Sequence, residues 1–93
     1  MRVDLALKYL CLVKSRSSVK HLCDDGVLLV NDRPVKPSAT LRAGDRVTIR
    51  SGHRNLTIEL LNVPDRQLSK SVSSAYYTRL AESDTTGEDE AEW

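Results

Sequence analysis

Residues 15–33 read SRSSVKHLCDDGVLLVNDR, a stretch that predicts a short helix followed directly by a β-hairpin. Ser15 can begin the helix, because its hydroxyl can accept a hydrogen bond from a free amide of the first turn. Gly26 can end it, because glycine takes a left-handed backbone conformation at little energetic cost. We therefore expect a helix over residues 16–24.

The hairpin follows from the residues beyond this glycine. The run VLLV has the composition of a short strand, and Asn31 and Asp32 tolerate the unusual backbone angles of a tight turn. Further along, the run AGDRVTIR predicts a turn that leads into a strand over residues 46–50. Alternation along that strand directs Val47 and Ile49 inward.

Helical and strand patterns also flank this stretch. Asp4 can cap a first helix over residues 5–12, and alternating apolar residues predict another strand over residues 56–63. Apolar residues then recur at roughly helical spacing, which predicts a last helix between residues 67 and 82. Residues 82–93 are polar, acidic and without periodicity, so we expect a disordered tail there.

The charge of the chain is distributed unevenly along its length. The 93 residues include 29% charged ones, and the formal net charge is only +1. Residues 1–54 nevertheless contain eleven Lys and Arg against five Asp and Glu, whereas residues 81–93 contain six acids and no base. A basic body with an acidic tail suggests a polyanionic partner for the body. Charge alone leaves open the alternative that the surface cations only confer solubility.

Several classes of protein are excluded at this level. No run approaches the ~18 apolar residues of a membrane span and no secretory signal is present, so we expect a cytoplasmic location. Cys11 and Cys23 are too few for a disulfide framework and, together with His21, too few for a zinc site. Cys23 and His21 are two residues apart on a helix and cannot meet as a catalytic pair. We expect no enzymatic activity, no metal and no cofactor.

Cations gather at the start of the helix predicted over residues 16–24. Lys14, Arg16 and Lys20 lie at or near its N-terminus, where free amides and the helix dipole already favour an anion. Arg16 and Lys20 are four residues apart and project together from the face that does not pack. Ser17 can add a hydroxyl hydrogen bond to a phosphate.

Residues 2–49 resemble a complete S-four RNA-binding domain, the module named after ribosomal small-subunit protein four. The opening Arg-hydrophobic-Asp of that family corresponds to residues 2–4, and its Ser-Arg-Ser corresponds to residues 15–17. The hairpin pattern Gly-x-Val/Ile-x-Val-Asn is approximated by residues 26–31, and the final Gly-Asp with its strand corresponds to residues 44–49. Several separate motifs in the same order make the resemblance specific.

This resemblance implies an α+β fold in which two N-terminal antiparallel helices pack on a small, bent, mostly antiparallel sheet, the αL RNA-binding motif, with an added C-terminal helix. The S-four core would span residues 1–52, an extra strand and the C-terminal helix would complete the same domain over residues 53–81, and residues 82–93 would be the tail. Structured RNA would be held by the second helix and its surroundings. The RNA-facing residues carried over by position are Arg2, Lys8, Lys14, Arg16, Ser17, Lys20 and Lys36.

The segments NLTIELLNVP and SSAYYTRL resemble the ends of stand-alone members, the RqcP family of ribosome-associated quality control and, less closely, the fifteen-kilodalton ribosome-associated heat-shock proteins. The resemblance implies a factor that binds large ribosomal subunits obstructed by peptidyl-tRNA and contacts ribosomal RNA and tRNA. We expect this factor to be a monomer. The alternatives are a small protein-interaction module and a general binder of structured RNA. Of two adjacent tyrosines, we expect Tyr76 in the core and regard Tyr77 as the better candidate for stacking on a base.

Overall fold

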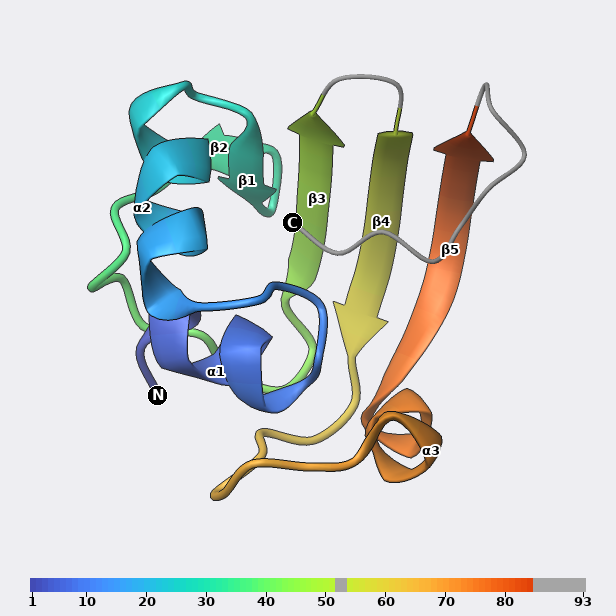
Figure 1. Ribbon diagram of the computed structural model, residues 1–93. Coiled ribbons are helices and arrows are strands. Elements are labelled where there is room, and N and C mark those ends of the chain that lie inside the picture. The colour runs from blue at the N-terminus through green and yellow to red at the C-terminus, as the bar shows by residue number, and fades with distance from the viewer. Residues whose placement is uncertain (52–53, 85–93) are drawn as a thin grey trace.

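A five-stranded antiparallel sheet is the largest element of the computed structural model, which describes residues 1–51 and 54–84. Its strands lie in the order β2-β1-β3-β4-β5, and in Figure 1 α2 lies over β1 and β2 while β3, β4 and β5 extend beyond the helices. The predicted α+β class is confirmed. In chain order the elements are α1 (Val3–Tyr9), α2 (Arg16–Asp24), β1 (Leu28–Val30), β2 (Arg33–Pro34), β3 (Arg46–Ser51), β4 (Arg54–Leu60), α3 (Lys70–Ser73), the 3-10 turn η1 (Ser74–Tyr76) and β5 (Tyr77–Asp84).

Helix α2 has the predicted bounds, because its ends are determined locally. The Ser15 hydroxyl accepts a hydrogen bond from the amide of Ser18 at 3.3 Å, and Gly26 has a φ of 71° beyond the C-terminus. Val19 and Leu22 are buried. The predicted cap, stop and packing face are therefore confirmed.

The predicted turns are also confirmed. Asn31 and Asp32, with φ values of 53° and 69°, connect β1 to β2, and Gly44, with a φ of 93°, precedes β3. Asn and Asp accept such angles more readily than other residues with side chains. Val47 and Ile49 of β3 point into the core, as alternation predicted.

Helix α1 begins earlier than expected, and Asp4 is not its cap. The helix starts at Val3, after Arg2 in the capping position, and no side chain caps it. Its first amides are satisfied by a distant loop, since the amide of Val3 donates to the carbonyl of Ala39 at 2.8 Å and that of Asp4 to Pro37 at 3.1 Å. The Asp4 carboxylate is thereby available for another role.

The prediction of a last helix between residues 67 and 82 is wrong over most of its length. Helix α3 is a single turn, η1 follows it, and the eight-residue strand β5 then pairs antiparallel with β4. Pairing with β4 satisfies the backbone groups that β4 would otherwise leave unpaired, and this outweighs a weak helical periodicity. Strand β5 also includes residues 82–84 of the expected tail, and the rest of that tail, residues 85–93, lies outside the described residues.

The core is built from small aliphatic side chains of both layers, and it contains one tyrosine. Tyr77 is 9% exposed at the start of β5, so its proposed role in base stacking is wrong. Tyr76 is partly buried against the core, as expected. The largest fully buried side chains include Leu7, Leu10, Leu28, Leu41, Ile49, Ile58 and Leu60. No helix in the described part of the chain is long and apolar enough to cross a bilayer.

Candidate nucleic-acid interface

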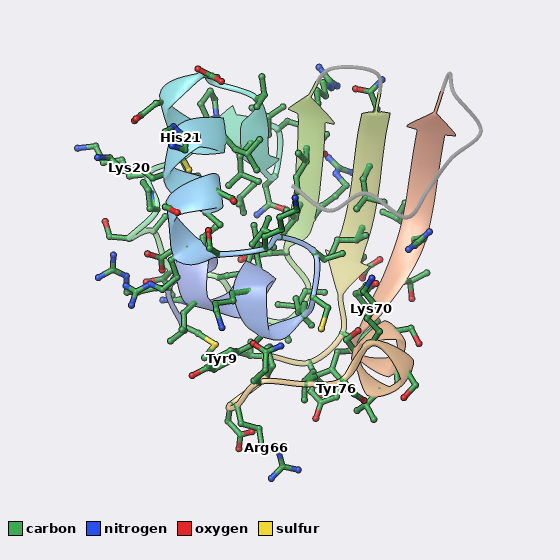
Figure 2. The ribbon with its side chains drawn as sticks, in the orientation of Figure 1. Tyr9, Lys20, His21, Arg66, Lys70 and Tyr76 are labelled. Carbon is green, nitrogen blue, oxygen red and sulfur yellow. The ribbon has the colours of Figure 1, made fainter. Side chains whose placement is uncertain are left out.

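A cleft of about 570 Å³ lies where the start of α1, the exposed face of α2 and the loop after β2 meet. In Figure 2, Lys20 and His21 project from α2 on the side away from the sheet. Most of the side chains around the cleft are polar or charged. They are Arg2, Asp4, Arg16, Ser17, Lys20, Asp24, Lys36, Pro37 and Ser38.

Backbone hydrogen bonds join two of these segments, the chain start and the loop after β2. Arg2 forms an isolated antiparallel bridge with Thr40, and the amide of Leu41 donates to the carbonyl of Met1 at 2.7 Å. These bonds and those to the first amides of α1 hold residues 36–41 against the chain start. Lys36 therefore lies beside residues that are more than thirty positions away in the sequence.

Asp4 lies at the base of the cleft and joins two arginines. Its carboxylate, in a residue only 4% exposed, accepts hydrogen bonds from Nε and Nη2 of Arg2 at 3.2 and 3.1 Å. Arg16 reaches the same carboxylate from α2, with Nη2 at 3.3 Å from Oδ2. The backbone amide of Leu5 also donates to this carboxylate, at 2.7 Å. Both arginine side chains remain 51% exposed, so each can contact a ligand.

The pKa of Asp4 reflects two opposing effects. Burial by itself raises the pKa of this carboxyl, because it removes the charged form from water. Hydrogen bonds from Arg2, from the Leu5 amide and from Arg16 outweigh burial and hold the pKa below its ordinary value. Asp4 is therefore a carboxylate at neutral pH, and its charge is matched by guanidinium groups.

The cleft as a whole carries an excess of positive charge. Four of its residues are cations, Arg2, Arg16, Lys20 and Lys36, and two are acids. Guanidinium groups offer several N–H donors in a plane, which suits the oxygens of a phosphate. The cleft therefore has the chemistry of a binding site for a polyanion.

Five of the seven predicted RNA-facing residues meet in this cleft, and two do not. Lys8 lies on α1 with its Nζ 3.2 Å from Oε1 of Gln67, in contact with the loop between β4 and α3. Lys14 is exposed in the connection between α1 and α2 and does not line the cleft. The five that meet are Arg2, Arg16, Ser17, Lys20 and Lys36.

The cleft also contains residues that the sequence did not predict as site residues, and Asp4 is the most important. An Asp near the start of a helix is favoured as a cap, so its type and position gave no reason to expect an ion pair. Two signals were available in the sequence: the spacing of Arg2 from Asp4, and a second arginine at the start of the next helix. The other residues missed are Asp24, Pro37 and Ser38.

Neither cysteine lines the cleft. Burial raises the pKa of the Cys23 thiol, and the nearby carboxylates of Asp24 and Asp4 raise it further, so the thiol is protonated at neutral pH. Cys11 is a free thiol that donates to the carbonyl of Leu68 at 3.1 Å. Within residues 1–51 and 54–84, no three His, Cys, Asp or Glu side chains form a group that could hold a metal.

Comparison with known proteins identifies the family. The family model of the S4 domain, which is the S-four RNA-binding domain, matches residues 1–47. The chain belongs to the S4 domain family. All nine cleft residues fall within the matched segment, so the cleft is formed by the S4 domain itself.

Relatives resemble this S4 domain protein along most of its length. A protein of Halalkalibacterium halodurans named "RQC P-site tRNA stabilizing factor" is 32% identical over 82 residues, covering 88% of this chain and 93% of that protein. A protein of Bacillus subtilis with the same name is 29% identical over 76 residues, covering 82% of this chain and 88% of the relative. The similarity therefore extends beyond the S4 domain into β4 and the segment after it.

Solved structures share the fold of this S4 domain protein. Heat Shock Protein 15 of Vibrio cholerae, described as trimeric, superposes with a TM-score of 0.80 at 26% identity over 87% of this chain and 82% of that one. A hypothetical protein, HP1423, superposes with a TM-score of 0.74 at 23% identity, covering 87% of this chain and 98% of the other. The latter likeness shows the fold alone.

Proposed function

We propose that this S4 domain protein binds structured RNA and acts in ribosome-associated quality control on large ribosomal subunits obstructed by peptidyl-tRNA. The observation that carries the proposal is the convergence of Arg2, Arg16, Lys20 and Lys36 on one cleft. Relatives named as factors that stabilize tRNA in the P site support the ribosomal setting. The ligands would be ribosomal RNA and tRNA, and the protein would act as a monomer in the cytoplasm, where ribosomes are.

The cleft suits a folded RNA because its cations come from different directions. Arg16 and Lys20 project from α2, Arg2 lies at the start of α1, and Lys36 lies on the opposite loop. Phosphates brought close together by RNA folding can be contacted from several sides at once. Ser17 adds a hydroxyl to the lining of the cleft. The proposed role is binding, and it requires neither catalysis nor a cofactor.

A double charge reversal tests the proposal. Arg16→Glu with Lys20→Glu replaces two cations of the cleft by acids, and we expect the affinity for purified large subunits to fall by about 100-fold or more. The matched control is Arg33→Glu with Arg42→Glu, which changes the net charge equally at two exposed positions outside the cleft. Circular dichroism establishes that both variants are folded, and co-sedimentation measures binding.

The outcomes separate the proposal from its alternatives. A folded cleft variant that binds large subunits as the wild type does would refute the assignment and favour a protein-interaction module. Equal binding of the wild type to large subunits, small subunits and unrelated structured RNA would indicate a general RNA binder. Preference for large subunits that carry peptidyl-tRNA over empty ones supports the quality-control role.

A further inference from the structure

We propose that Asp4 is a positioning residue that gives the cleft its selectivity for structured RNA, by holding Arg2 and Arg16 as a fixed pair. The inference rests on the proposed function, since it concerns how that site distinguishes one RNA from another. A carboxylate by itself repels phosphate, but in this proposal Asp4 favours the recognition of phosphate by positioning the two arginines.

A single carboxylate oxygen brings the two guanidinium groups together. Nη2 of Arg2 is 3.1 Å from Oδ2 of Asp4, and Nη2 of Arg16 is 3.3 Å from the same atom. Two guanidinium groups this close repel each other unless a negative charge lies between them. Without the carboxylate, we expect the two half-exposed side chains to separate and to sample many rotamers.

Asp4 is itself held in place. Its carboxylate accepts the Leu5 amide at 2.7 Å, and its own amide donates to the carbonyl of Pro37 at 3.1 Å. The residue is 4% exposed, and bonds at both its carboxylate and its amide hold it in place at the base of the cleft. Among the described residues, neither Lys20 nor Lys36 makes a comparable bond to a buried acid. The cleft thus combines two fixed guanidinium groups with two adaptable ammonium groups.

The donors left over define what the pair can recognise. A guanidinium has five N–H donors, and Arg2 directs Nε and Nη2 toward Asp4. Arg16 likewise directs Nε and Nη2 toward Asp4. The remaining donors belong to side chains that are 51% exposed, so a ligand can reach both groups at a separation determined by the carboxylate. Two phosphates at the matching separation gain both contacts without an ordering cost, and a flexible strand gains no such advantage.

The carboxylate also lowers the net charge of the cleft. Binding to any polyanion depends mainly on the number of cations, so a site selected only for strong binding would be better without Asp4. Geometry and charge therefore make opposite predictions for removal of this carboxylate. This opposition makes the proposal testable.

The test compares Asp4→Asn with Asp24→Asn on two ligands, large ribosomal subunits and single-stranded poly(A). Both variants remove one negative charge from the cleft, but only Asp4→Asn releases the arginines. We expect Asp4→Asn to lose about tenfold or more in affinity for subunits and to gain about twofold to fivefold for poly(A). Asp24→Asn should increase the affinity for both ligands modestly. If the two variants behave alike, the proposal is overturned.

A second pair of variants keeps the test decisive if Asp4→Asn does not fold. Arg2→Lys and Arg16→Lys each preserve the charge of the cleft and keep an N–H donor for the ligand. Each loses the planar guanidinium group that bonds to Asp4. We expect each to weaken subunit binding about tenfold and poly(A) binding by less than about twofold, because the charge that attracts a flexible polyanion is kept. Equal subunit binding by lysine variants and wild type would overturn the proposal. A wild type that does not bind subunits would instead refute the proposed function.

Discussion

At the scale of single residues, Asp4 shows how one buried charge is retained in a small domain. A buried carboxylate is unfavourable unless hydrogen bonds and opposite charges compensate for lost hydration. Here Arg2, Arg16 and the Leu5 amide supply that compensation, and they lower the pKa of the carboxyl despite its burial. The same contacts therefore link the stability of the fold to the arrangement of the cleft.

This link predicts a pH dependence of stability. The pKa of Asp4 is lower in the folded protein than in the unfolded chain, where it is about 3.9. The ionised carboxylate therefore stabilises the fold fully above about pH 3.9. This stabilisation is lost as the pH falls through the pKa of Asp4 in the folded protein. We expect Asp4→Asn to lower the free energy of unfolding by about 1 to 3 kcal/mol at pH 7. The difference from wild type should shrink below about pH 4. Chemical denaturation of both proteins at pH 7 and pH 3 measures this difference in the free energy of unfolding. A difference of equal size at the two pH values would contradict the prediction.

At the scale of elements, local and non-local signals conflict after Pro64. Val72, Tyr76 and Leu80 have helical spacing, yet Val72 and Leu80 are 48% and 49% exposed and only one helical turn forms. Strand β5 buries Tyr77 and pairs with the full length of β4. A sequence window contains the helical periodicity but not the unpaired edge of β4, so it favours the wrong element.

Tyr77→Ala tests the assignment of this element. If Tyr77 is a core residue of β5, its truncation leaves a cavity, and we expect a loss of about 3 kcal/mol in the free energy of unfolding. Thr78→Ala, at the exposed neighbour on the same strand, should change it by less than about 0.5 kcal/mol. Urea denaturation compares the two. A stable Tyr77→Ala variant with reduced RNA binding would favour the stacking role instead.

At the scale of the whole molecule, the basic residues do not act as one uniform surface. Lys8 interacts with the loop before α3, and Arg46 pairs with Asp32 at 2.6 Å, whereas four cations of different segments share the cleft. The net charge of +1 describes none of these regions. The number of phosphates contacted should therefore depend on the number of cations in the cleft and not on the total number of Lys and Arg residues.

This view predicts the salt dependence of binding. If the four cations of the cleft each neutralise one phosphate, the logarithm of the association constant should fall with the logarithm of salt concentration with a slope of about −3. Titrations of large subunits between low and moderate salt measure the slope. Arg16→Glu with Lys20→Glu should make it shallower, and Arg33→Glu with Arg42→Glu should not. A slope near zero would argue against phosphate contacts.

The sequence determined the features that depend on neighbouring residues. Ser15 and Gly26 define the ends of α2, and Asn31 and Asp32 form the hairpin turn, because capping and backbone conformation are decided within a few residues. The presence of Arg16 on the exposed face of α2 follows in the same way. All seven predicted RNA-facing residues came from their positions in the resembling family, and five of them line the cleft.

Only the tertiary structure decided which of these residues meet. Lys36 reaches the cleft and Lys8 does not, because backbone bonds attach residues 36–41 to the chain start while Lys8 contacts Gln67. Asp4 became the anchor of two arginines because the same loop bonds the amides of Val3 and Asp4 and so places the start of α1, and its carboxylate, beside Arg16. Long-range pairing also made β5 a strand, since the free energy of sheet formation depends on a partner that the local sequence does not contain.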